Sequence, residues 1–215
     1  IMKEVAKIVP NLIGGSADLG SSTKTYLKDM GDIKEGHYNG KNIWFGVREH
    51  CMGAVLNGLA LTGFKTFGST FLSFADYVKP AIRLSSLMKL PVNYIFTHDS
   101  INIGQDGPTH QPIEQLAMLR SIPNLNVFRP ADSNEVVGCW NEMIKGNSTN
   151  ALILSRQEGR NLRETDAFKV KYGAYIVRKE VDKLHAIIIA TGSEVSTSID
   201  IANHLYEKYK VDIRV

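Results

Sequence analysis

The stretch Asn42-Ile-Trp-Phe-Gly-Val-Arg-Glu-His50 decides how this sequence is interpreted. Its apolar run 43–45 predicts a buried strand that ends at the following glycine, and the small-residue run 51–61 predicts a helix. The polar residues between them therefore stand at the carboxyl end of a strand, where open α/β sheets bind ligands. Glu49 enters a mostly apolar helix, which disfavours the charged form of a carboxyl group and predicts a protonated hydrogen-bond donor. The alternative is a surface ion pair between Arg48 and Glu49 at a helix start, where acidic residues are favoured anyway.

Strand and helix patterns alternate on both sides of this stretch. The expected strands lie at 12–13, 43–45, 63–67, 91–97, 125–128, 151–154, 172–178, 186–190 and 211–215. The expected helices lie at 51–61, 71–82, 113–122, 133–145 and 191–209. Such alternation predicts an α/β fold with a doubly wound parallel sheet. The polar loops near 14–23, 46–50, 98–110 and 155–157 all follow strands, so we expect them to share one edge and line one cleft.

The length of 215 residues allows one large domain, or one domain and a piece of another. Residues 1–182 are expected to form the first α/β domain. Residues 183–215 are expected to begin a second α/β domain with a strand, a helix and a strand, and to stop there. Residues 1–9 read as the tail of a helix, so an upstream part is expected.

The composition excludes several classes of protein. With 43% hydrophobic and 22% charged residues, an ordinary globular core is expected. The net charge of +3, without any block of Lys or Arg, argues against a nucleic-acid partner. No apolar run approaches the ~18 residues of a membrane span, and no signal-peptide pattern is present. Cys51 and Cys139 lie in expected helices as buried thiols, which indicates a reducing compartment and a cytoplasmic protein.

The loop from Thr97 to Pro112 is the most informative in the chain. It follows a buried strand and carries His98, Asp99, Asp106 and His110 together with glycine and proline. Histidine and aspartate at a strand's carboxyl end are typical of a chemical site. They could instead bind metal, but the two histidines are twelve residues apart, which matches no standard zinc spacing. We therefore predict no metal site within the chain.

Seven motifs together resemble the transketolase family. They are Gly14-Gly-Ser-Ala-Asp-Leu19, Gly46-Val-Arg-Glu-His50, Ser69-Thr-Phe-Leu-Ser-Phe74, Thr97-His-Asp-Ser-Ile101, Asp106-Gly-Pro-Thr-His-Gln-Pro112, Leu152-Ile-Leu-Ser-Arg156 and Ile189-Ala-Thr-Gly-Ser-Glu-Val195. They occur in the family's order and span nearly the whole chain. The resemblance covers the central pyrimidine-binding domain and, from about residue 183, the start of the carboxyl-terminal domain. It leaves out the amino-terminal domain, which in this family holds the cofactor's diphosphate and a divalent metal.

This resemblance implies an activity and a set of cofactor contacts. The family transfers a two-carbon ketol unit from a ketose phosphate to an aldose phosphate in the pentose phosphate pathway. It uses thiamine diphosphate with Mg²⁺ or Ca²⁺, and the active site lies at the subunit interface of a homodimer. By resemblance, Glu49 is a catalytic residue that hydrogen-bonds the pyrimidine nitrogen and promotes its imino tautomer. Phe71, Phe74 and Tyr77 correspond to the aromatic pocket around that ring, and Asp18 lies near the cofactor.

The resemblance also implies the substrate contacts. Asp106 and His110 meet substrate hydroxyl groups near the reacting carbon, and His110 has a catalytic role. Ser22, His98 and Arg156 belong to the sugar-phosphate end. Arginine suits a phosphate because its planar fork donates two hydrogen bonds at once.

Two alternatives stay open at this point. A sibling enzyme such as dihydroxyacetone synthase uses the same apparatus on formaldehyde. A non-catalytic α/β binding module is the alternative from another class, and it applies if the 215 residues are the whole protein. A longer chain, or a second polypeptide, favours the enzyme. Two departures from the family's usual pattern are Gln105, where many members have Glu, and the run Gly-Ser-Ser-Thr at 20–23.

Overall fold

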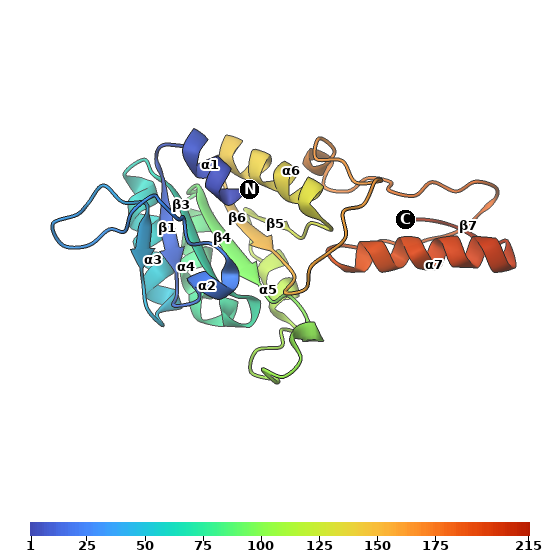
Figure 1. Cartoon of the computed structure of the whole chain (residues 1–215), viewed down its shortest axis with the longest axis horizontal. Helices are drawn as coiled ribbons and strands as arrows, with labels where there is room; N and C mark the ends of the chain where they lie inside the picture. The colour runs from blue at the N-terminus through green and yellow to red at the C-terminus, as the bar shows by residue number, and fades with distance from the viewer. The chain divides into compact units, whose positions relative to one another are not determined.

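The computed structural model describes residues 1–215 (Figure 1), which divide into two compact units. The sheet unit comprises residues 1–128 and 143–156, and the carboxyl-terminal unit comprises 129–142 and 157–215. Residues 157–182 therefore group with the carboxyl-terminal unit. The domain boundary expected between residues 182 and 183 stays a prediction. None of the helices combines the length and the apolar character that a membrane crossing needs.

The sheet unit is built on six parallel strands, which confirms the predicted doubly wound α/β fold. In chain order they are β1 (Leu12–Ser16), β2 (Asn42–Trp44), β3 (Lys65–Phe71), β4 (Val92–Thr97), β5 (Leu125–Phe128) and β6 (Thr149–Ile153). In the sheet they lie in the order β2-β1-β3-β4-β6-β5, and every pair is parallel. The carboxyl ends of all six strands therefore lie along one edge, as the sequence predicts.

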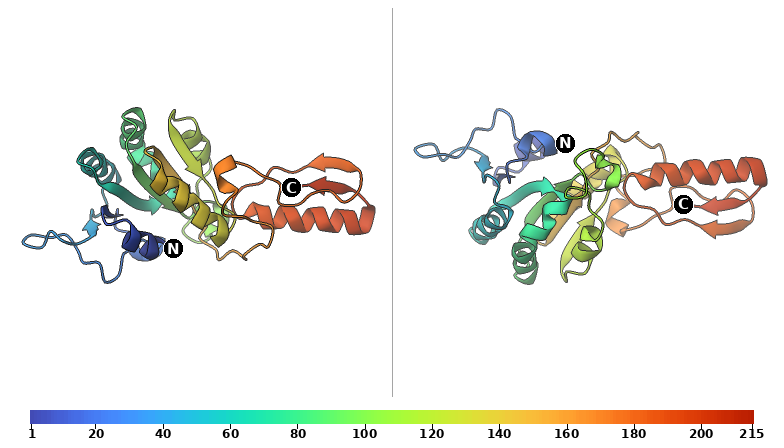
Figure 2. Two further views of the ribbon diagram at one scale, coloured as in Figure 1. Left: turned by 90° about the horizontal axis from the view of Figure 1, so that it is seen from above. Right: turned by 90° about the horizontal axis from the view of Figure 1, so that it is seen from below.

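Helices cover both faces of this sheet. They are α1 (Met2–Ile8), α2 (Gly20–Thr23), α3 (Glu49–Leu61), α4 (Ala75–Leu87) and α5 (Gln115–Arg120), with the short 3₁₀ turns η1 (Leu72–Phe74) and η2 (Ile101–Ile103). Figure 2 shows α3 and α4 on one face and α1 on the other. A side chain at Gly53 would bring its Cβ to 2.6 Å from the Cβ of Ala81, so glycine allows α3 to lie close against α4.

The core of the sheet unit lies between the sheet and the α3–α4 face. Its largest fully buried side chains include Tyr94, Phe96, Met52, Leu56 and Ile82. Every residue of β4 is buried, as expected for a central strand of a parallel sheet covered on both faces. Burying these apolar groups on one continuous sheet face stabilises the unit by about 25 cal/mol for each Å² removed from water.

The carboxyl-terminal unit contains the strand–helix–strand that the sequence predicts. The parallel strands β7 (Leu184–Ile187) and β8 (Asp212–Arg214) pair with each other, and α7 (Glu194–Tyr209) connects them. Helix α6 (Ser133–Lys145) begins in this unit at a capping box. The Glu135 amide donates to Asp132 Oδ1 at 3.1 Å, and Glu135 Oε2 accepts from the Ala131 amide at 2.7 Å.

Several expectations about local structure are wrong. β2 is only partly buried: it is an edge strand of the sheet beside β1, and Trp44 is 67% exposed. The run 14–23 is not one loop, because β1 continues to Ser16 and α2 follows. Residues 172–178 form no strand, and only the 3₁₀ turn η3 (Val170–Tyr172) touches this run. Cys139 is buried as expected, but Cys51 is exposed.

Candidate active site

Glu49 lies where the sequence predicts, at the carboxyl edge of the sheet. Gly46 follows β2 with a φ of +65°, which glycine adopts without steric cost, and turns the chain into α3. Glu49 is the first residue of that helix and only 8% exposed. Its Oε1 accepts a hydrogen bond from the Thr70 hydroxyl on β3, at 3.4 Å. The carboxyl group is therefore held by the fold and keeps hydrogen-bonding capacity for a ligand.

The alternative of an Arg48–Glu49 surface ion pair does not hold. Glu49 is buried, whereas Arg48 is exposed, and its Nη1 donates to the backbone carbonyl of Phe45 at 3.1 Å. This bond holds Arg48 against the turn that precedes α3. The two neighbours in sequence thus take different environments, and Glu49 enters the protein interior as the functional interpretation requires.

The aromatic residues Phe71, Phe74 and Tyr77 form a connected row at the same edge. The Phe71 and Phe74 rings lie 6.0 Å apart and the Phe74 and Tyr77 rings 5.9 Å apart, centroid to centroid. Phe71 is 6% exposed, whereas Tyr77 is 64% exposed. The buried side of the same helical stripe is supplied by Val78 and Ile82. The stripe is thus part core and part open aromatic surface, which suits a wall against a planar ligand.

Two histidines from the loop after β4 join this aromatic row. The His98 ring stacks on Phe71 with centroids 3.7 Å apart, and the His110 ring meets Phe74 edge-on at 5.1 Å. His98 is 7% exposed, and its Nδ1 lies 2.8 Å from the Thr97 hydroxyl. His110 is half-buried, with Nδ1 at 2.8 Å from the Thr109 hydroxyl. The structure therefore brings both predicted histidines to the aromatic residues, although they are twelve residues apart.

The charges around His98 come from the other predicted substrate residues. Burial lowers the pKa of His98, and the positive charge of Arg156, three residues beyond β6, lowers it further. Asp106 acts in the opposite direction, because its negative charge favours the imidazolium form. Both Arg156 and Asp106 are exposed. A buried imidazole with an exposed cation and an exposed carboxylate within electrostatic reach is suited to bind an anionic, hydroxyl-bearing ligand.

Asp18 and Ser22 lie in the segment after β1, the strand that neighbours β3 in the sheet. Asp18 is exposed with a φ of +65°, and Ser22 is exposed on α2. A buried set of hydroxyl groups anchors the segment to β3, with Ser69 Oγ at 2.6 Å from Thr25 Oγ1 and 3.1 Å from Thr23 Oγ1. The fold thus fixes the backbone on which Asp18 and Ser22 stand and leaves their side chains in solvent.

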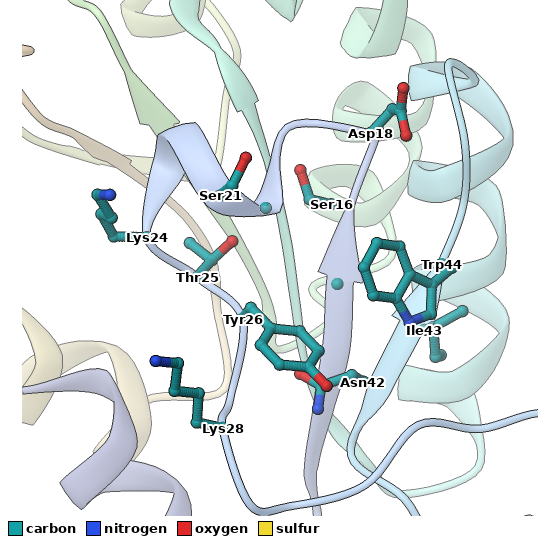
Figure 3. Close-up of a pocket in the computed structure, with 12 residues that line it drawn as sticks. Ser16, Asp18, Ser21, Lys24, Thr25, Tyr26, Lys28, Asn42, Ile43 and Trp44 are labelled. Atoms are coloured by element: carbon teal, nitrogen blue, oxygen red, sulfur yellow. The ribbon is translucent and has the colours of Figure 1, made fainter.

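A cavity of about 460 Å³ opens beside this segment (Figure 3). Asp18, Ser21 and Thr25 line it, and the Tyr26 and Trp44 rings contribute apolar surface. Of the predicted site residues, Asp18 alone belongs to the lining. Phe71, Phe74 and Tyr77 are not among the residues that line this cavity.

The sequence does not identify the threonines that support the site. Ser69 and Thr70 both lie within β3, which continues to Phe71. Thr70 contacts Glu49, and Thr97, the last residue of β4, contacts His98. Both threonines lie at the ends of strands in a parallel sheet, and this position could have identified them from the sequence. Thr97 also stands one residue before the predicted site residue His98.

The residues of the candidate site fit the aminopyrimidine half of thiamine diphosphate. A buried carboxyl group and a partly exposed aromatic row match an aminopyrimidine ring, which offers ring nitrogens and a flat apolar face. For the diphosphate a divalent cation would be required, and the chain contains no group of three or more His, Cys, Asp or Glu residues placed to hold one. The residues present therefore fit the pyrimidine half.

Comparisons with known proteins agree with this arrangement. Residues 1–161 match the family model for the transketolase pyrimidine-binding domain. Transketolase of Bacillus subtilis is 48% identical over the whole chain, and that of Geobacillus stearothermophilus is 50% identical over 93% of it. The crystal structure of Pichia stipitis transketolase with sedoheptulose 7-phosphate superposes with a TM-score of 0.96 at 42% identity, over 100% of this chain.

The chain spans about a third of the length of these relatives. It covers 33% of the B. subtilis protein, 31% of the G. stearothermophilus protein and 33% of the P. stipitis chain. It covers 67% of the chain of a split-gene transketolase, an inactive β4 tetramer, with a TM-score of 0.79 at 27% identity. The family match covers most of the chain, and this chain therefore belongs to the transketolase family, within its pyrimidine-binding domain.

Proposed function

We propose that this chain is the pyrimidine-binding part of a transketolase, which transfers a two-carbon ketol unit from a ketose phosphate to an aldose phosphate. The observation that carries this proposal is the buried Glu49 carboxyl group at the sheet edge, in a chain of the transketolase family. The P. stipitis transketolase forms a complex with sedoheptulose 7-phosphate, and this sugar phosphate supports the substrate class.

Each residue of the site then has a defined task. Thiamine diphosphate, when bound, supplies the centre that stabilises the negative charge developing on the substrate's carbonyl carbon. Glu49 holds a proton at the pyrimidine nitrogen, and the low exposure of its carboxyl group keeps competing water away. Phe74 and Tyr77, whose rings lie 5.9 Å apart, flank the flat face of the pyrimidine. His110, edge-on to Phe74, bonds substrate hydroxyl groups beside the reacting carbon.

The phosphate end of the substrate is assigned to His98 and Arg156. The charge of Arg156 influences the protonation of His98, so an anion bound between them would meet both groups. Asp106, whose charge acts on the same imidazole, is placed to accept hydrogen bonds from substrate hydroxyl groups. Ser22 on α2 and Asp18 before it are assigned to the substrate phosphate and the cofactor by resemblance.

The remaining parts of the enzyme are proposed to come from elsewhere. We assign the diphosphate and its Mg²⁺ to an amino-terminal domain, as the resemblance implies, in a homodimer located in the cytoplasm. The inactive tetramer of the split-gene transketolase supports the view that a chain of this kind needs a second part for activity. Dihydroxyacetone synthase remains the sibling alternative, because the same residues would serve a formaldehyde acceptor.

The test is an assay of this chain joined to, or mixed with, the amino-terminal domain, with thiamine diphosphate and Mg²⁺. Xylulose 5-phosphate is the donor, and an aldose phosphate or formaldehyde is the acceptor. The proposal predicts turnover with the aldose phosphate and much slower turnover with formaldehyde. Preference for formaldehyde would identify the sibling enzyme, and binding without turnover on either acceptor would identify a non-catalytic module.

A further inference from the structure

His98 is held from two sides at the end of β4. Thr97, the last residue of β4, pairs in the sheet with Phe71, the last residue of β3. This register places the His98 ring on the Phe71 ring, with centroids 3.7 Å apart and ring planes 26° apart. On the other side the Thr97 hydroxyl lies 2.8 Å from Nδ1 of the imidazole. Thr97 and His98 are 6% and 7% exposed, so water competes little for this contact.

The backbone of His98 adopts a conformation that non-glycine residues disfavour. Its φ is +61°, in the left-handed region, where the Cβ of an L-residue crowds the neighbouring carbonyl oxygen. Strained conformations of this kind persist where the surrounding structure imposes them, and they concentrate at functional sites. The stacking on Phe71 and the bond to Thr97 are the contacts that impose it here.

We propose that Thr97 is a positioning residue, whose hydroxyl donates to Nδ1 of His98 and so presents Nε2–H to the anionic end of the substrate. The hydrogen bond does two things at once. It fixes the rotation of the ring, and it places the single proton of the neutral imidazole on the nitrogen that faces away from Thr97. For the substrate, the inference rests on the proposed function; for the tautomer, it rests on the geometry alone.

The direction of the bond follows from the chemistry of imidazole. The neutral ring has one donor nitrogen and one acceptor nitrogen. Burial and the charges of Arg156 and His110 favour the neutral form, against the opposing charges of Asp106 and Asp99. If Nδ1 carried the proton, Nε2 would present a lone pair to a phosphate and repel it. A donating Thr97 hydroxyl leaves Nε2–H free to donate to that anion.

The kinetic test replaces Thr97 in the complete, cofactor-loaded enzyme. Thr97→Val should raise KM for xylulose 5-phosphate by about twofold to tenfold, the effect of losing one ordinary hydrogen bond, and leave kcat nearly unchanged. Thr97→Ser keeps the hydroxyl and should restore the wild-type KM. Thr66→Val is the matched control, because Thr66 is also buried, on the neighbouring strand β3, and its hydroxyl has no hydrogen-bond partner.

The pH dependence separates this role from general packing. Imidazolium donates from both nitrogens whether or not Thr97 is present. The KM ratio between Thr97→Val and the wild type should therefore be largest above the pKa of His98 and fall toward one below it. A ratio that stays constant across the range from about pH 5 to 8, or an unphosphorylated donor such as hydroxypyruvate that is equally affected, would overturn the substrate half of the inference.

The tautomer of His98 can be measured by NMR on this chain alone, without an activity assay. In nitrogen NMR of the ¹⁵N-histidine-labelled chain, the His98 ring should show a protonated Nε2 and a hydrogen-bonded, unprotonated Nδ1 above its pKa. In Thr97→Val the fraction protonated at Nδ1 should rise. A wild-type ring protonated at Nδ1 would overturn the inference, even if the enzyme is a transketolase. The predicted tautomer together with an unchanged KM would instead remove His98 from the phosphate end and leave its bond to Thr97 intact.

Discussion

The candidate site has two parts that the fold treats differently. The strand-end group, Glu49, Phe71 and His98, lies at or directly after secondary-structure elements and is 6–8% exposed. The loop group, Asp18, Asp106 and Arg156, lies in connecting segments and is exposed. The first group receives its position from the sheet register and from buried hydroxyl groups, and the second receives little support within this chain.

This difference in support indicates that the two groups of residues have different functions. Groups that must sit within a fraction of an ångström of the reacting atoms are best carried by rigid elements and locked by neighbours. Groups that recognise a flexible sugar phosphate can stand on loops, where they reach a ligand at a small cost in folding stability. Substitution of Glu49 should therefore lower turnover, substitution of Phe71 should lower stability, and substitution of Arg156 should lower substrate affinity.

The largest effect is expected for Glu49→Gln in the complete enzyme. The amide keeps the size and most of the hydrogen-bond geometry, but it cannot exchange a proton with the pyrimidine nitrogen. We expect kcat at saturating cofactor to fall by roughly 10²–10⁴-fold. Glu207→Gln, an exposed substitution on α7, is the control and should leave kcat unchanged. Near-normal turnover of Glu49→Gln would place Glu49 outside the chemistry.

Stability should distinguish the two ends of the aromatic row. Phe71→Ala removes a ring that is 6% exposed and should lower the free energy of unfolding of the chain by roughly 3–5 kcal/mol. Tyr77→Ala removes a ring that is 64% exposed and should cost less than about 1 kcal/mol. Urea unfolding followed by circular dichroism measures both changes. Equal losses of unfolding free energy would show that both ends of the aromatic row are packed alike, and would contradict an exposed end at Tyr77.

Arg156→Ala tests the loop group. It removes a charge-assisted phosphate contact worth roughly 1.5–3 kcal/mol, so KM for phosphorylated sugars should rise about tenfold to a hundredfold with kcat nearly unchanged. With hydroxypyruvate, which has no phosphate, the kinetic constants should stay close to those of the wild type. Arg83→Ala, on the exposed side of α4, is the matched control. An equal loss on both donors would remove Arg156 from the phosphate end.

The smallest effect is a pH dependence carried by His98. Burial, and then the charge of Arg156, lower the pKa of His98 in the folded chain below 6.5, its ordinary value. The unfolded chain therefore binds this proton first as the pH falls, and stability is lost from about pH 6.5 down through the lowered pKa.

His98→Asn isolates that contribution, because asparagine tolerates the left-handed backbone found at this position. We expect a flatter dependence of the unfolding free energy on pH between about 7 and 5 in this variant. His204→Asn, which removes an exposed imidazole from α7, should keep the slope of the wild type. A wild-type slope in His98→Asn would show that the imidazole titrates alike in the folded and unfolded chains.

The fold was largely predictable because hydrophobic periodicity reports burial. The runs 91–97 and 125–128 predicted β4 and β5 nearly to the residue, and the alternation of elements predicted the parallel sheet. The exposed edge strand β2 was misjudged, since an apolar residue such as Trp44 does not reveal what covers it. No strand forms at 172–178, although the backbone of Val177 and Arg178 hydrogen-bonds to that of Val215.

The sequence predicted the residues of the site, but it did not predict the hydrogen bonds that hold them in place. Motifs identified Glu49 and His98, and the shared sheet edge explained why distant residues could meet. The bonds from Thr70 and Thr97 depend on the register between β3 and β4, which the sequence does not state.

The central claim is that this chain provides the pyrimidine half of a cofactor site and no diphosphate half. Calorimetric titration of the folded chain with thiamine diphosphate and Mg²⁺ tests it most directly, with circular dichroism to verify the fold. A carboxyl group and an aromatic row should bind the pyrimidine weakly, so no saturation is expected at micromolar cofactor. Adding the amino-terminal domain should produce saturable, Mg²⁺-dependent binding. Micromolar binding to the chain alone would contradict the claim and locate the diphosphate site within these 215 residues.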